Sequence, residues 1–211
     1  NIRRPCTINL QSLLLIIGTF AIVAYFATML YLHIRFKHYN PVLHAVSDYG
    51  TGASRRYFTL SGYCSLISTF ALFGTLLVWN HPFASQQLVI SWLAVKIVSL
   101  IGLMIFPTDL PEQRKTLIGL LHYLFAILNF TATLKLAIHL TPVFTALTLT
   151  PSFKTALTVL QQLIQYSLTG VVLAMLIPPL KRLFGLIERV FLYSSSLYFL
   201  VINLILLTEN I

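Results

Sequence analysis

Residues 10–32 read LQSLLLIIGTFAIVAYFATMLYL and contain no charged side chain. A helix of about 20 predominantly apolar residues is long enough to cross the hydrocarbon core of a bilayer. Arg3 and Arg4 precede this run, as basic residues precede the apolar part of a signal peptide. The run is too long for a signal peptide, however, and no small-residue cleavage site closes it. We therefore expect it to be retained as the first membrane span.

Five further apolar runs follow along the chain, separated by short connections. We expect six spans, at residues 10–32, 57–79, 88–106, 117–140, 156–177 and 190–207. Only 9% of the residues are charged, whereas about 25% is usual in soluble proteins. Backbone groups in lipid must be bonded internally, and the runs lack the alternation of a membrane β-barrel. The sequence therefore predicts a single all-α domain over residues 1–211, a polytopic bundle of six transmembrane helices.

Basic residues are unevenly divided between the two ends of this predicted bundle. Six spans place both termini on one side, and the connections after spans one, three and five on the other. Those connections hold nine of the fourteen basic residues, against three on the side of the termini. The nine are Arg35, Lys37, Arg55, Arg56, Arg114, Lys115, Lys181, Arg182 and Arg189.

The positive-inside rule predicts that these connections are cytoplasmic and that both termini lie outside the cell (inner) membrane. A net charge of +9 would suggest nucleic-acid binding in a soluble protein. Here we interpret it as a topological signal and expect no nucleic-acid partner. The basic face should attract anionic membrane lipids.

Two short motifs hold two of the five acidic residues. The first is HAVSDYGTG at residues 44–52, and the second is FPTDLP at residues 106–111. His122 falls about one and a half turns into span four, roughly 8 Å below its start. The order of the spans puts both motifs at one membrane surface. Ionisable residues grouped at helix ends in so apolar a chain indicate where function is to be sought.

Several interpretations of these motifs are open. His44, Asp48, Asp109 and His122 could bind a divalent metal, with zinc as the cofactor. Ser47, Asp48, Asp109 and His122 could act in catalysis, with Ser47 as nucleophile or hydrogen-bond donor. The same surface could bind a lipid headgroup. In the structural interpretation, Asp109 caps a turn, Asp48 pairs with Arg55 or Arg56, and His122 bonds a loop carbonyl.

Lys96 and Lys135 are the basic residues inside the predicted spans, and no acid falls inside any of these spans. We expect Lys135 to extend its ammonium group to the interface, and the deeper Lys96 to do so less readily. Asn129 should bond between helices. Haem is not expected, because His122 and His139 share span four and spans two, three, five and six carry no histidine.

The two motifs together resemble the signature of a small prokaryotic membrane family. The sequence SDYGTG at residues 47–52 is similar to the family pattern S-[ED]-x-G-x-G, and the run from Gly102 to Asp109, followed by His122, is similar to its second motif. The family is catalogued as domain of unknown function 998. The resemblance covers about residues 10–205 and implies a six-helix membrane protein with no established activity. The family often has Glu where this chain has the shorter Asp48.

Two main hypotheses of function follow. In the first, the protein is not an enzyme: it binds membrane lipid, or it is an accessory subunit beside other membrane subunits. In the second, it is a metal-dependent lipid hydrolase or transferase that uses His44, Ser47, Asp48, Asp109 and His122 at the cytoplasmic face. A small-solute transporter is a third alternative with less support, because proton relays in membranes usually use buried carboxylates.

Overall fold

All six predicted spans form α-helices. The computed structural model describes residues 9–109, 114–147 and 149–208. Its helices are α1 (Leu10–Arg35), α2 (Arg55–Val78), α3 (Gln86–Ile105), α4 (Leu117–Ala146), α5 (Pro151–Leu176) and α6 (Phe184–Thr208). Each is long and apolar enough to cross a membrane, and the described residues contain no strand. The predicted all-α transmembrane bundle is therefore confirmed.

Capping residues account for several of the helix ends. The Asn9 side chain accepts a hydrogen bond from the Ser12 N–H at the start of α1, and Thr116 accepts one from the Gly119 N–H at the start of α4. Both satisfy N–H groups that have no partner within the helix. Pro151 is the first residue of α5, where its missing N–H removes no helical bond.

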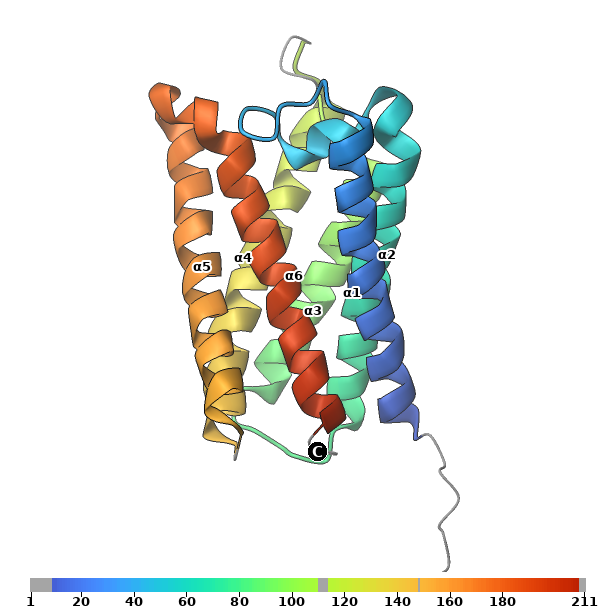
Figure 1. Ribbon diagram of the computed structural model, residues 1–211, viewed down its shortest axis with the longest axis vertical. Coiled ribbons are helices and arrows are strands. Elements are labelled where there is room, and N and C mark those ends of the chain that lie inside the picture. The colour runs from blue at the N-terminus through green and yellow to red at the C-terminus, as the bar shows by residue number, and fades with distance from the viewer. Residues whose placement is uncertain (1–8, 110–113, 148, 209–211) are drawn as a thin grey trace, which may run out of the picture.

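The helices run side by side along the length of the molecule (Figure 1), and their contacts close into a ring. Each helix packs against the one before it in the chain, and α6 returns to pack against α1. A weaker contact joins α4 to α6. The long connection from α1 to α2 lies at the same end of the bundle as the connection from α3 to α4, and the C-terminal end of α6 lies at the opposite end. Both sequence motifs therefore share one end, as predicted.

Apolar packing is densest at the end of the bundle that holds the C-terminal end of α6. Its largest cluster includes Trp79, which stacks on Phe144 with ring centroids 5.5 Å apart. A smaller cluster around Tyr25, Met29 and Tyr49 lies beneath the connection from α1 to α2. The two clusters leave space between them inside the ring.

The connection from α1 to α2 folds back onto the bundle as two short 3₁₀ segments, η1 (Val46–Gly50) and η2 (Gly52–Ser54). Gly52 has a φ of 56°, in the left-handed region that side chains other than glycine rarely adopt. A third 3₁₀ segment, η3 (Pro178–Leu183), joins α5 to α6.

Candidate functional site

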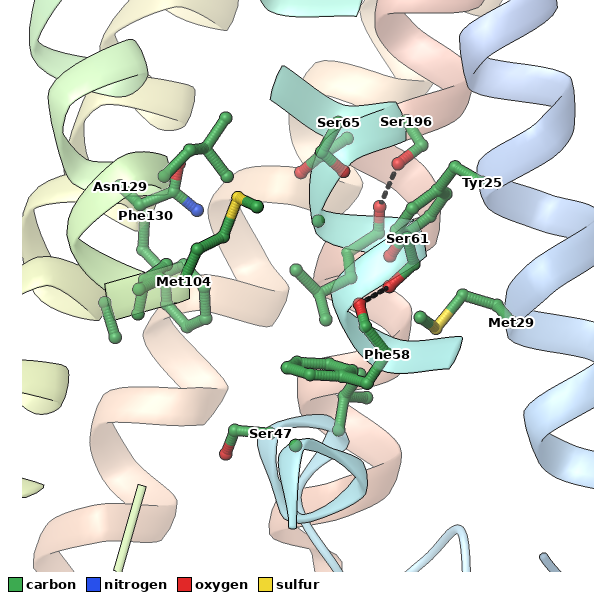
Figure 2. Close-up of a pocket in the computed structure, with 18 of the residues that line it drawn as sticks. Tyr25, Met29, Ser47, Phe58, Ser61, Ser65, Met104, Asn129, Phe130 and Ser196 are labelled. Carbon is green, nitrogen blue, oxygen red and sulfur yellow. Dashed lines mark hydrogen bonds between the residues drawn. The ribbon is translucent and has the colours of Figure 1, made fainter. Parts of the chain in front are cut away.

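A cavity of about 170 Å³ lies inside the ring, at the end that carries both motifs. Its walls come from α1, α2, α3, α4 and α6, and no described residue of α5 lines it. Figure 2 shows Met104, Asn129 and Phe130 on one side of the cavity, and Ser47 at the end nearest η1. Most of the wall is apolar, with polar groups spaced along it.

Hydroxyl groups of α2 and α6 form one polar part of the wall. The hydroxyls of Ser61, Ser68 and Thr69 each donate to a carbonyl in the preceding turn of α2, at 2.7–2.9 Å. Those of Ser195 and Ser196 do the same in α6. A hydroxyl that donates its proton keeps two lone pairs, so this wall offers hydrogen-bond acceptors to a bound molecule.

Lys96 forms the deep polar group of the cavity. Its side chain is only 9% exposed. The Nζ atom donates to Asn129 Oδ1 at 3.2 Å and to Thr133 Oγ1 at 2.8 Å. Lys96, which was expected to extend to the interface less readily than Lys135, does not extend there, because acceptors on α4 hold it inside the ring. The interhelical bond predicted for Asn129 is confirmed.

Glu188 and Arg189 are buried in the first turns of α6. The sequence placed span six from residue 190, and hence both side chains in the connection before it. The structure corrects this placement in two ways. Glu188 is an acid inside a span, and the Arg189 side chain is buried in α6 and not exposed in the connection. The sequence does contain a signal for this longer span. Apolar residues lie on both sides of the pair, and those before it extend the apolar run of span six by more than one helical turn.

These two side chains fasten the connection from α1 to α2 onto the bundle. The Val46 N–H donates to Glu188 Oε2 at 2.6 Å, and Glu188 also lines the cavity. One Arg189 nitrogen donates to the carbonyl oxygens of Pro41 and His44 at 2.8 and 2.7 Å. The Arg189 Nε–H donates to His33 Nε2 at 2.8 Å. The connection that contributes Val46, Ser47 and Gly50 to the cavity lining is therefore held by α6.

In the first motif, Ser47 lines the cavity, whereas His44 and Asp48 do not. The His44 Nδ1 accepts the Asn40 N–H at 2.8 Å. Asp48 is buried, and burial raises the pKa of its carboxyl above the ordinary value of 3.8. His44, a backbone hydrogen bond at Ala45 and Arg189 oppose this rise in pKa. The basic side chains that act on Asp48 are therefore those of His44 and Arg189, and neither Arg55 nor Arg56 is among them.

The raised pKa of Asp48 gives a pH-dependent prediction. Because the folded protein holds the Asp48 proton more tightly than the unfolded chain, the carboxyl favours folding below pH 3.8. That contribution is lost as the pH rises through the raised pKa. We expect an Asp48→Asn variant to lose less stability than the wild type between acid and neutral pH, measured as thermal midpoints in detergent. Parallel pH profiles of the two proteins would contradict this.

The second motif closes the connection from α3 to α4. Asp109 accepts the Thr116 N–H at 2.7 Å and the Thr116 hydroxyl at 2.8 Å. His122 is buried and its Nδ1–H donates to the Phe106 carbonyl at 2.8 Å. These contacts agree with the structural interpretation, in which Asp109 caps a turn and His122 bonds a loop carbonyl. His122 nevertheless lines the cavity, whereas Asp109 does not.

The structure thus brings together part of the predicted site. Ser47 and His122 line one cavity, with no hydrogen bond between them, while Asp48 is buried in η1 and Asp109 is bonded to Thr116. Within residues 9–109, 114–147 and 149–208, no three His, Cys, Asp or Glu side chains are grouped so as to hold a metal ion. The metal and catalytic interpretations stay predictions.

Comparison with known proteins gives one match. A family model described as a protein of unknown function (DUF998) matches residues 19–204. That range runs from within α1 to within α6 and includes both motifs and the cavity. No curated protein and no solved structure matches the chain.

Proposed function

The chain belongs to this family of unknown function, and from that premise we propose that it binds an amphiphilic membrane lipid in its central cavity. The observation that supports the proposal is the lining. Ligand sites are usually concave and mostly apolar, with a few well-placed polar groups. The cavity combines aromatic and methionine side chains with hydroxyl groups, Lys96 and Glu188.

The volume of the cavity limits which part of a lipid can enter. An engineered protein cavity of about 150 Å³ binds benzene, so about 170 Å³ accommodates a group of that size. A whole two-chain lipid does not fit. We propose that one end of a lipid occupies the cavity while the remainder of the molecule lies outside it.

We propose that the end of the bundle that carries both motifs faces the cytoplasm and that both termini lie outside the inner membrane. The charge imbalance supports this orientation even though Arg189 is buried. Removing Arg189 from the nine basic residues of that side leaves eight, against three on the other. Cytoplasmic connections carry the excess of Lys and Arg. The test is a reporter that is active only in the cytoplasm, fused after Ile211. Activity of this fusion would contradict the orientation.

Lipid binding is tested by filling the cavity. Ser65 lines the cavity (Figure 2), whereas Ile67 is absent from its lining and 46% exposed. We expect Ser65→Phe to retain at least about tenfold less lipid than the wild type, a loss of about 1.4 kcal/mol in binding free energy. The measurement is mass spectrometry of lipid that remains bound after purification in mild detergent.

The matched control is Ile67→Phe, which adds the same ring to the same helix outside the cavity. It should retain lipid as the wild type does. Equal retention by all three proteins would place the bound lipid on the outer surface and contradict the proposal, as would a wild type that carries no lipid.

A further inference from the structure

Building on the proposed function, we infer that the ligand carries an anionic oxygen group, a carboxylate or a phosphate, which binds Lys96 in the depth of the cavity. Three observations support this role of Lys96: its depth in the bundle, the neutral character of its hydrogen-bond partners, and the distance of the acidic residues from it.

Lys96 lies far from either end of its helix. Nine residues separate it from Ile105, the last residue of α3, which is roughly 14 Å along the helix axis. A charged side chain is costly at such a depth in a membrane, and those that occur usually face the interior of the bundle and mark a binding site or pathway. Lys96 follows this pattern, since it is buried and lines the cavity.

The partners of Lys96 are all neutral in the described part of the chain. Its Nζ atom donates to Asn129 and Thr133 and lies 5.6 Å from the centroid of the Phe199 ring. An ammonium group has three N–H donors, so these two hydrogen bonds leave one donor for a ligand. They also fix the position of the nitrogen at the cavity wall.

The acids that the structure describes are bound elsewhere. Asp48 lies in η1 and does not line the cavity. Asp109 is held by Thr116, and Glu188 accepts the Val46 N–H of η1. Glu188 and Phe199 are eleven residues apart in α6, roughly 16 Å along the axis. Lys96 therefore has no counter-ion among the described residues, and an anionic ligand would supply one.

The rest of the lining is suited to the apolar body of such a ligand. Leu100 and Met104 lie on α3 between Lys96 and the second motif, and Phe130 and Arg55 line the same cavity. Arg55 is exposed, so its charge can attract an anion before it enters. The ligand class is therefore an anionic single-chain amphiphile.

The inference is tested with the full-length protein in nanodiscs of phosphatidylcholine. The probes are palmitate, palmitoyl lysophosphatidate and the uncharged hexadecanol. A hydrogen bond to a charged group corresponds to a tenfold or greater change in affinity. We therefore expect both charged amphiphiles to bind at least about tenfold more tightly than hexadecanol. Acetate and inorganic phosphate, which lack the apolar body, should compete only weakly, which separates an amphiphile site from a site for small anions.

Lys96→Met tests the residue itself. We expect this variant to bind palmitate and hexadecanol with similar affinity. Methionine also leaves Asn129 and Thr133 without their donor, which lowers the thermal midpoint, so the ratio of the two affinities is the readout that a purely structural role of Lys96 would not change. The control is Lys135→Met, because Lys135 is exposed on α4, and it should keep the wild-type preference.

The outcomes separate the two proposals. Equal binding of charged and uncharged amphiphiles by the wild type would overturn the role of Lys96 and leave the proposed function in place, even if Lys96→Met fails to fold. A charge preference that survives Lys96→Met would also overturn it. Failure of every amphiphile to bind would overturn the proposed function as well. If acetate or phosphate competed as strongly as palmitate does, the site would bind small anions and the assignment of an amphiphile would be wrong.

Discussion

Replacing Arg189 with alanine is expected to lower the free energy of unfolding by about 3–5 kcal/mol, the range for removing one partner from a buried charged network. Arg189 is only 4% exposed. Its guanidinium bonds the carbonyl oxygens of Pro41, His44 and Gly185 and the ring of His33. Loss of these donors leaves buried acceptors without partners, which is more costly than the bonds themselves are favourable.

The chemistry of His33 shows how specific this network is. The His33 Nδ1 lies 2.6 Å from the Met29 carbonyl oxygen, which can only accept, so Nδ1 carries the proton. The Nε2 atom is then an acceptor and takes the Arg189 Nε–H. A lysine at position 189 would keep the charge but lose the planar set of donors. We expect Arg189→Lys to recover only part of the lost stability.

Thermal unfolding in detergent measures both variants. The control is Arg182→Ala, since Arg182 is exposed in η3 and surface changes usually alter stability by no more than about 0.5 kcal/mol. An Arg189→Ala protein as stable as Arg182→Ala would show that the connection from α1 to α2 is held by other contacts.

The helices were predictable because the signal for a membrane span is local. Each run of apolar residues indicates its own span, whatever its neighbours in space. The hydrogen bonds of Asp109 with Thr116 and of His122 with Phe106 were also within reach, because each joins residues across one short connection. Capping and loop closure follow from such short spacings.

Apolar residues on both sides of Glu188 and Arg189 indicate that the pair lies inside a span, but the contacts that make their burial tolerable were not predictable in the same way. Their partners, Val46 and the carbonyls of Pro41 and His44, lie more than 140 residues earlier in the chain. A pair of charges beside an apolar run normally marks the end of a span, because charges inside a membrane are costly. The backbone of a distant connection reverses that expectation here, since it supplies the bonds that make burial tolerable.

The direction of the Lys96 side chain was not predictable for a related reason. Its position in the sequence shows how deep it lies, but not which way its side chain faces. Acceptors on α4 decide this, and the sequence predicted Asn129 only as a general bond between helices. The cavity itself depends on how five helices meet, which no single run of sequence specifies.

The Gly185→Ala variant is expected to be the second most damaging substitution, with a loss of about 3 kcal/mol, at the upper end of what overpacking usually costs. Alanine favours a helix over glycine by about 1 kcal/mol, so a gain in stability would be expected if the site were open. At Gly185, however, a methyl group would overlap the His44 carbonyl oxygen, which belongs to backbone, and would lie 2.9 Å from an Arg189 nitrogen. The connection from α1 to α2 must then move away from α6.

A matched glycine separates this overlap from backbone strain. At Gly52 an added methyl group meets nothing within 4 Å, but the φ of 56° disfavours alanine, at a cost of about 1–2 kcal/mol. Gly52→Ala should therefore lose stability and keep its lipid. Gly185→Ala should lose both, because Val46 and Ser47 line the cavity and move with the displaced connection. If Gly185→Ala bound lipid as Gly52→Ala does, the cavity would not depend on the seating of this connection on α6.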